Sequence, residues 1–268
     1  MNSSLSRQPD WFLHAHLAAT LDKKLDILKN SPHKIILAAA DGNESYRLLK
    51  ARYPKAEFQE FDQREDYLYW SQETRKAEQK LWQKLSSHLP VQQATNQLPP
   101  TEQADMIWSN LGLIHQTDPI HVIENWAEAL QTDGLLFFSH FGPDTFLQLF
   151  EVWQTHGIIV RAPMLIDMHD LGDMLLQHGF YDPVMDMSKL TLQYVSVERM
   201  IEDMRVAGLW QSLQFEDEEE AIRILIQHWQ SGEIHDITLE LIYGHGIKKQ
   251  LMPEHTATVQ FYPQPPHS

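Results

Sequence analysis

Short apolar runs alternate with helix-like segments along most of this chain, and that alternation limits its fold more than any other feature. The apolar runs predict strands over residues 34–40, 57–62, 104–111, 135–140, 189–195 and 237–243. Helical periodicity predicts helices over 11–29, 46–54, 65–88, 120–130, 168–178 and 197–208, one ending at Trp153 and one opened by the acidic run 216–220. Repeated strand–helix units predict an α/β fold with a mostly parallel sheet, helices on both faces, and a ligand crevice at the carboxyl ends of the strands. The last two strands suit an antiparallel edge.

The length of the chain favours one domain. With 268 residues and 43% hydrophobic side chains it can bury a sizeable core, and we expect a single domain over 1–268. Residues 90–103 are predicted to form a loop or weak strand, and the proline-rich tail 260–268 is predicted to be loose.

The charge balance of the chain argues against some partners. Its 37 acidic and 21 basic residues give a formal charge of −16, which opposes binding to nucleic-acid phosphates and to anionic membranes. The sequence has no Cys, so it has no disulfide framework and no thiolate nucleophile. No apolar stretch is long enough to cross a bilayer. We expect a cytoplasmic protein that has no membrane span and does not bind nucleic acid.

Several longer runs follow one another in the order found in one enzyme family. They are Phe12-Leu13-His14, Ser109-Asn110-Leu111, the segments 134–139, 141–145, 166–173 and 179–187, and Tyr243-Gly244-His245. In these runs the chain resembles the malonyl-[acyl-carrier protein] O-methyltransferases of biotin synthesis, which are class I S-adenosylmethionine-dependent methyltransferases. The resemblance implies a Rossmann-like, mostly parallel seven-stranded sheet with an antiparallel edge strand. It also implies a cofactor half over about 30–140 and an acceptor half over about 141–250.

The loop after the first strand departs from that family. The resemblance implies glycines where the backbone approaches the methionine end of the cofactor, but these positions hold Ala39, Asp41 and Asn43. Leu37 replaces the usual strand-end acid, and Gly42 lies one residue out of phase, as in an ordinary turn. If the Asp41 carboxylate lay ~4 Å from that of the cofactor at an effective dielectric of ~20, repulsion would cost roughly 4 kcal/mol. We therefore expect impaired binding of S-adenosylmethionine.

Other cofactor positions are partly kept. Asp62 ends the second predicted strand, where the family's acid binds the ribose hydroxyls through two acceptor oxygens. The alternative is a solvated acid that begins the next helix near Arg64. The acid that contacts the adenine maps to Ala94, and Asn96 is the nearest polar substitute. By the same resemblance, Asn110 is a further candidate contact.

Two histidines and three arginines are candidates for the acceptor side. His115 and His140 lie at the ends of the predicted strands 104–111 and 135–140, over the crevice where the resemblance places the methyl acceptor. Either could orient the acceptor, although a carboxylate is already an anion and needs alignment rather than a base. Arg161, Arg199 and Arg205 could pair with an acidic acceptor, and surface ion pairing is the alternative.

The remaining conspicuous residues have structural interpretations. Asp167, His169, Asp170 and Asp173 read as a helix N-terminus rather than a metal site, because Asp caps free amides there. We predict no metal centre. The tryptophans expected to pack in the core or a lid are Trp108, Trp126, Trp153, Trp210 and Trp229.

Two classes of function stay open. The first is S-adenosylmethionine-dependent methylation of a free carboxylate on an acyl chain held by acyl-carrier protein. That carrier is acidic, and the basic groups available to receive it are Lys50, Arg52, Lys55 and the Lys248-Lys249 pair. The second is a non-catalytic pseudo-methyltransferase that acts as a binding or assembly partner. A related assembly factor that performs a different modification is a further alternative.

Overall fold

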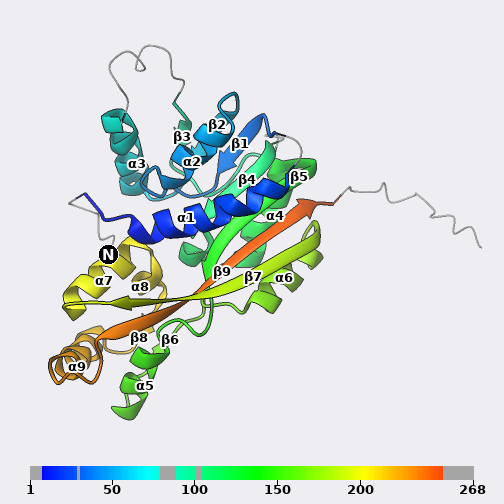
Figure 1. Ribbon diagram of the computed structural model, residues 1–268. Helices are drawn as coiled ribbons and strands as arrows, with labels where there is room; N and C mark the ends of the chain where they lie inside the picture. The colour runs from blue at the N-terminus through cyan, green and yellow to red at the C-terminus, as the bar shows by residue number, and fades with distance from the viewer. Residues whose placement is uncertain (1–7, 29–30, 79–88, 101–103, 250–268) are drawn as a thin grey trace, which may run out of the picture.

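The computed structural model describes residues 8–28, 31–78, 89–100 and 104–249, and its centre is a seven-stranded sheet (Figure 1). The strand order is β3-β2-β1-β4-β5-β9-β7. The strands are β1 (Lys34–Leu37), β2 (Glu57–Phe61), β3 (Val91–Gln93), β4 (Ala104–Asn110), β5 (Leu130–Phe141), β7 (Phe180–Gln193) and β9 (Asp236–Lys248). The first five pair in parallel, and β9 runs antiparallel to both β5 and β7. The predicted α/β fold with antiparallel pairing at one edge is confirmed.

Helices cover both faces of this sheet (Figure 1). The helices of the described residues are α1 (Phe12–Lys24), α2 (Glu44–Arg52), α3 (Glu65–Glu78), α4 (Pro119–Ala129), α5 (Leu147–Thr155), α6 (Met168–Gln177), α7 (Val197–Val206), α8 (Leu209–Ser212) and α9 (Glu218–Gln230), with 3-10 turns η1 (Leu25–Ile27) and η2 (Leu113–His115). Leu17 of α1 and Leu49 of α2 pack in the cluster on one face, whereas Trp126 of α4 and Leu171 of α6 pack on the other.

The central strands are apolar on both sides because both sides are covered. Ile35 and Leu37 of β1 belong to one core cluster, and Ile36 between them belongs to the other. This burial explains why the strand appears in the sequence as a continuous apolar run. The predicted core tryptophans are buried, except that Trp229 is partly buried, and the buried ones are Trp108, Trp126, Trp153 and Trp210.

Two parts of the strand prediction were wrong. The edge strand β7 begins at Phe180, well before residue 189, although Pro183 argues against a strand. Its pairing shifts register between Tyr181 and Val184, and Asp182 in this bulge has a φ of 51°. An edge bulge accommodates proline because no ladder hydrogen bond is lost there. A second sheet of β6 (Val160–Arg161) and β8 (Gln214–Phe215) was not predicted, because strands this short carry no periodic signal.

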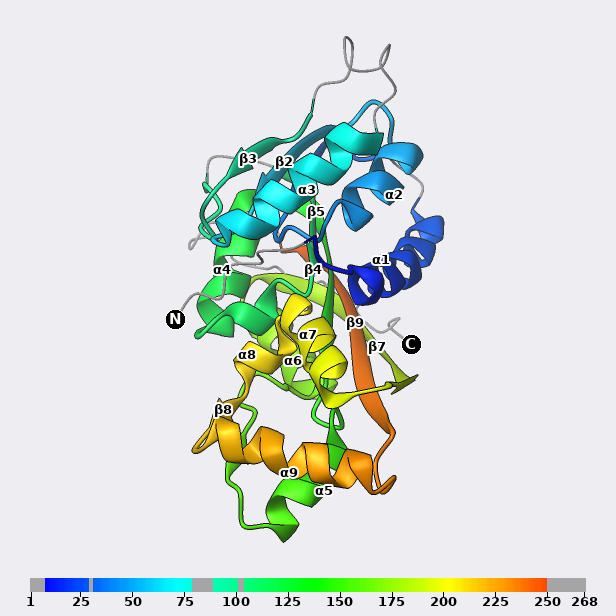
Figure 2. The same cartoon turned by 90° about the vertical axis from the view of Figure 1, so that its left-hand side faces the viewer.

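Some predictions fall outside the described residues. The predicted helix over 65–88 is described as α3 up to Glu78, and the remainder of that prediction lies beyond the described residues, as does the predicted loose tail 260–268. Within the described ranges, none of the helices combines the length and apolar character needed to span a membrane. Figure 2 shows α5, α9 and β8 at the end of the molecule opposite α2 and α3.

Candidate functional site

The chain passes from β1 into α2 through two consecutive left-handed residues. Gly42 has a φ of 70° and Asn43 a φ of 87°. Asn tolerates this conformation better than most residues, so position 43 keeps a backbone suited to the glycine implied by the resemblance. The indole of Trp11 lies against Gly42, where an added Cβ would come within 2.3 Å of the ring. Both the positive φ and the close approach therefore require glycine at position 42.

The carboxylate of Asp41 is buried and bonded within the protein. It is 2% exposed and accepts hydrogen bonds from the Ser45 amide at 3.1 Å, the Ser45 hydroxyl at 2.5 Å and Asn110 Nδ2 at 2.8 Å. The Ser45 hydroxyl in turn accepts from Trp108 Nε1 at 2.7 Å. Burial raises the pKa of Asp41 to about 6, although the bonds from Ser45 and Asn110 oppose the shift. An internal carboxylate thus occupies donors in the first turn of α2.

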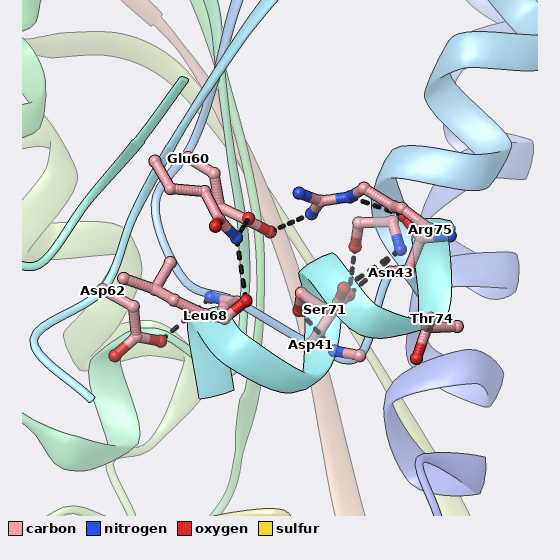
Figure 3. A network of polar contacts seen from close by, with 12 residues as sticks. Asp41, Asn43, Glu60, Asp62, Leu68, Ser71, Thr74 and Arg75 are labelled. Carbon is pink, nitrogen blue, oxygen red and sulfur yellow. Dashed lines mark hydrogen bonds and ion pairs between the residues drawn. The ribbon is translucent and has the colours of Figure 1, made fainter. Parts of the chain in front are cut away.

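A buried network fixes the rest of this loop to α3 (Figure 3). Figure 3 shows Arg75 between Glu60 and Asn43, with Nη2 to Glu60 Oε1 at 2.5 Å and Nε to Asn43 Oδ1 at 2.7 Å. Arg75 and Glu60 are 3% and 0% exposed. Ser71 Oγ accepts from the Gly42 amide at 3.0 Å, and Asn43 Nδ2 donates to Glu78 at 2.9 Å. This ion pair was not predicted, because its only signal in the sequence is an acid inside a buried strand.

Asp62 lies immediately after β2, as predicted, and both oxygens of its carboxylate accept hydrogen bonds from groups of the protein itself. Its Oδ1 accepts from the backbone amide and Nε of Arg64 at 2.8 and 2.9 Å. Its Oδ2 accepts from Arg64 Nη2 at 2.6 Å and from the Ala40 amide at 2.9 Å. Since a carboxylate oxygen has two good acceptor positions, both oxygens are fully engaged. The position of Asp62 was predicted from the sequence, whereas its bidentate pair with Arg64 was not.

A narrow pocket opens beside this ion pair. Its walls include Ala39, Asp62, Arg64, Asn96 and His115, and the volume in which a water-sized sphere can move is about 20 Å³. That is room for one water molecule. The pocket therefore brings together three of the sequence-predicted cofactor residues, Ala39, Asp62 and Asn96. In its wall the Arg64 guanidinium contacts His115 Nε2.

An apolar cluster fills the space beside the pocket. Trp11, Ala40, Tyr67, Leu68 and Val206 are all buried in it, and they come from four separate segments of the chain. The hydroxyl of Tyr67 donates to the carbonyl oxygen of Val206 at 3.0 Å, and its ring lies 3.6 Å from the Arg64 guanidinium. The end of α7 is thus tied to the residues that surround the pocket.

The two predicted histidines differ in their relation to the pocket, since His115 lines it and His140 does not. His140 is fully buried, and its Nε2 is 2.8 Å from the carbonyl oxygen of Met164. His115 lines the pocket and packs against Gly208, where a Cβ would come within 1.6 Å of its ring. His14 on α1 is also buried, and the sequence analysis did not select it, although it belongs to the Phe12-Leu13-His14 run.

The predicted arginines are placed differently. Arg161 is exposed in β6, beside α5 and away from the loop after β1 (Figure 1). Arg199 pairs with Asp10 at 2.9 Å and Asp203 at 2.8 Å, and Arg205 pairs with Glu218 at 3.1 Å. None of the three arginines lines the pocket. Surface ion pairing accounts for Arg199 and Arg205, and an acceptor role for any of them stays a prediction.

The helix-capping interpretation of the segment 167–173 is confirmed. Asp167 is the N-cap of α6, and its side chain accepts from the His169 amide at 2.7 Å. Among the residues that the structure describes, no group of three acidic or histidine side chains is arranged to hold a metal ion.

Comparison with known proteins shows the family of this chain. No family model matches the chain. The malonyl-[acyl-carrier protein] O-methyltransferase of Gallionella capsiferriformans is 31% identical to it over 240 residues, which are 84% of this chain and 80% of that protein. The chain belongs to the malonyl-[acyl-carrier protein] O-methyltransferase family. The protein of the same name from Laribacter hongkongensis is 28% identical over 258 residues, covering 91% of this chain and 86% of its own length.

Solved structures share the fold of this family member. The YcgJ protein of Bacillus subtilis superposes with a TM-score of 0.58 at 16% identity, over 88% of this chain and 99% of that one. An O-methyltransferase from a polyketide synthase of Brevibacillus brevis, solved with S-adenosylhomocysteine, gives a TM-score of 0.52 at 12% identity, over 87% of this chain and 72% of that one. Identities this low show the fold alone. It is the class I methyltransferase fold that the sequence predicted.

Proposed function

We propose that this chain is a non-catalytic member of its family, which binds a carboxylate on an acyl chain held by acyl-carrier protein but transfers no methyl group to it. This choice of ligand is supported by its relatives, which are malonyl-[acyl-carrier protein] O-methyltransferases. The observation that carries the proposal is the state of Asp62. Both of its oxygens are engaged by Ala40 and Arg64, so the ribose hydroxyls of S-adenosylmethionine would have to displace a guanidinium.

The loop after β1 supports the same proposal. The Ser45 amide, at the start of α2, would face the carboxylate of a cofactor, but Asp41 already accepts its hydrogen bond. A hydrogen bond to a charged group contributes about 1.5–3 kcal/mol. Losing two such contacts, one at Asp62 and one at α2, would weaken cofactor binding by about 3–6 kcal/mol, roughly a hundredfold to ten-thousandfold.

A second candidate is an active S-adenosylmethionine-dependent carboxyl O-methyltransferase. It is favoured by the position of Asp62 at the end of β2 and by polar pocket walls such as Asn96 and Gln116. In this candidate the half-buried side chain of Arg64 turns away from Asp62 when the cofactor enters. The two candidates differ in whether the contacts of the bound cofactor recover the free energy that moving Arg64 away from Asp62 costs.

Titration calorimetry with S-adenosylmethionine and a methyl-transfer assay with malonyl-acyl-carrier protein separate the candidates. The non-catalytic proposal predicts no cofactor binding tighter than about 1 mM. It also predicts no methyl ester product, together with measurable binding of the malonyl-carrier. Micromolar cofactor binding with ester formation would replace it with the second candidate.

A pair of arginine variants tests whether Arg64 blocks cofactor binding at Asp62. Arg64→Ala frees the oxygens of Asp62 and should tighten cofactor binding at least tenfold. Arg47 is an exposed arginine on α2 that pairs with Glu44, so Arg47→Ala makes the same charge change without opening Asp62. Equal affinities in the two variants would show that Arg64 is not what closes the site.

A further inference from the structure

Two histidines face each other where α5 and α9 end. These two helices pack side by side at one end of the molecule (Figure 2). His156 is the C-cap residue of α5, and His228 lies in the last turn of α9. Their Nε2 atoms are 3.5 Å apart, whereas the ring centroids are 4.9 Å apart, so the rings turn these nitrogens toward each other. We call these two residues the histidine pair.

Contacts at the other ring nitrogens fix the protons of the histidine pair. Nδ1 of His156 lies 3.0 Å from the carbonyl oxygen of Val152, which only accepts, so this Nδ1 carries a proton. Nδ1 of His228 contacts the carboxylate of Glu233, which also accepts. A neutral imidazole has one N–H, so each Nε2 of the neutral rings is left with a lone pair and no hydrogen. Two acceptors therefore face each other, and no hydrogen bond joins them.

A metal ion satisfies two such lone pairs at once. Zn²⁺ binds imidazole nitrogens at about 2.0–2.1 Å in tetrahedral geometry, which separates two ligand nitrogens by roughly 3.3–3.4 Å. The 3.5 Å between the two Nε2 atoms is close to that separation. Histidines that bind metals also donate their second N–H to a carboxylate or a backbone carbonyl, which fixes the direction of the ring. Glu233 and the carbonyl of Val152 make these two contacts here.

The charges around the histidine pair favour a cation. The C-terminal end of an α-helix carries a partial negative charge from its unpaired carbonyl groups, and each histidine of the pair lies at such an end. Glu233 adds a full negative charge beside His228. Arg223 is a cation on the same helix α9, but it is paired with Glu220 at 2.5 Å, which balances its charge.

An ion can reach the histidine pair directly from solvent. His156 is exposed, and the side chain of His228 is 20% exposed. Since no group of three acidic or histidine side chains in the described ranges is arranged to hold a metal, water completes the coordination. The sequence predicted no metal centre because the two histidines are 72 residues apart, so they show no metal-type spacing.

We propose that His156 and His228 bind one zinc-like transition-metal ion, and that this ion links the C-terminal ends of α5 and α9. Imidazole ligands suit Zn²⁺, Ni²⁺ and Cu²⁺, whereas Mg²⁺ prefers oxygen ligands. Neither histidine lines the pocket beside Asp62. The inference is therefore independent of the proposed function, and binding of S-adenosylmethionine would neither support it nor remove it.

Titration calorimetry with ZnCl2 tests the site on the full chain after EDTA has removed any metal. We expect Zn²⁺ to bind with a Kd below about 100 µM at pH 7.5, and MgCl2 to give no binding. His156→Gln and His228→Gln each remove one ligand and should weaken zinc binding at least tenfold. His169 is the matched control, because its Nδ1 is also bonded to a carboxylate, that of Asp167. His169→Gln should bind Zn²⁺ as the unchanged protein does.

A crystal soaked in ZnCl2 locates the ion. Anomalous scattering at the zinc absorption edge should place it about 2.0–2.1 Å from Nε2 of both His156 and His228. If only a shared proton or a water molecule joins the two rings, no anomalous peak will lie between them and neither variant will change zinc binding, which overturns the inference. Zinc bound only elsewhere on the chain overturns it as well. Circular dichroism checks that each variant folds, and if one does not, the other variant and the crystal still decide.

Discussion

Asp41 gives a prediction whose size follows directly from its surroundings. Its carboxylate is 2% exposed, and burial raises its pKa from the ordinary value of 3.8 to about 6. The folded state therefore holds this proton more tightly than the unfolded state. The resulting stabilisation is fully present below pH 3.8 and is lost as the pH rises through about 6. The difference between these two pKa values corresponds to about 3 kcal/mol in the free energy of unfolding.

Asp41→Asn removes this titration while keeping the size of the side chain. Urea unfolding of both proteins between pH 4 and pH 8 gives the free energy of unfolding at each pH. The stability of the variant relative to the unchanged protein should rise by about 2–3 kcal/mol over this range, mostly below pH 7. All other titrating groups cancel in the difference. A difference that stays flat, or that falls with pH, would mean that Asp41 is not a buried carboxylate and would refute the description of this loop.

Three further substitutions test the contacts around the loop and the crevice by urea unfolding. Asn43→Gly relieves a positive φ but leaves the buried Nε of Arg75 unpaired, so it should destabilise by about 1 kcal/mol, and a stabilised variant would contradict the network. Arg75→Met should cost about 3–5 kcal/mol because the buried carboxylate of Glu60 loses its cationic partner, whereas the double change with Glu60→Leu should recover most of it. Gly208→Ala drives a Cβ into His115 and should cost at least about 2 kcal/mol, and a neutral result would mean that these two segments do not touch.

Much of the fold followed from local patterns. The run that forms β1 is apolar throughout because helices cover both faces of the sheet, and its position was predicted correctly apart from its last residues. The N-cap role of Asp167 was also predictable, since an Asp before a helical pattern has one common explanation. The start of β7 was not predictable in this way, because Pro183 is tolerated only through a bulge at the sheet edge.

The sequence predicted where the residues of the candidate site lie but not which hydrogen bonds they make. Asp62 was expected at the end of β2, yet its pairing with Arg64 depends on side-chain directions that spacing does not give. For Asp41, the sequence predicted repulsion of a cofactor carboxylate. The structure adds another effect, because the side chain is buried against Ser45 and Asn110 and occupies donors at the start of α2. The contact between Asp41 and Asn110, which are 69 residues apart in the chain, exists only once the sheet has formed.

The central claim is that the chain's own side chains occupy the contacts that S-adenosylmethionine would use. A crystal structure of the protein soaked in S-adenosylhomocysteine at millimolar concentration tests it most directly. We expect the guanidinium of Arg64 to remain on Asp62, the carboxylate of Asp41 to remain on Ser45, and no nucleoside in the pocket. Ribose hydroxyls bound to Asp62, with Arg64 turned away, would contradict the claim.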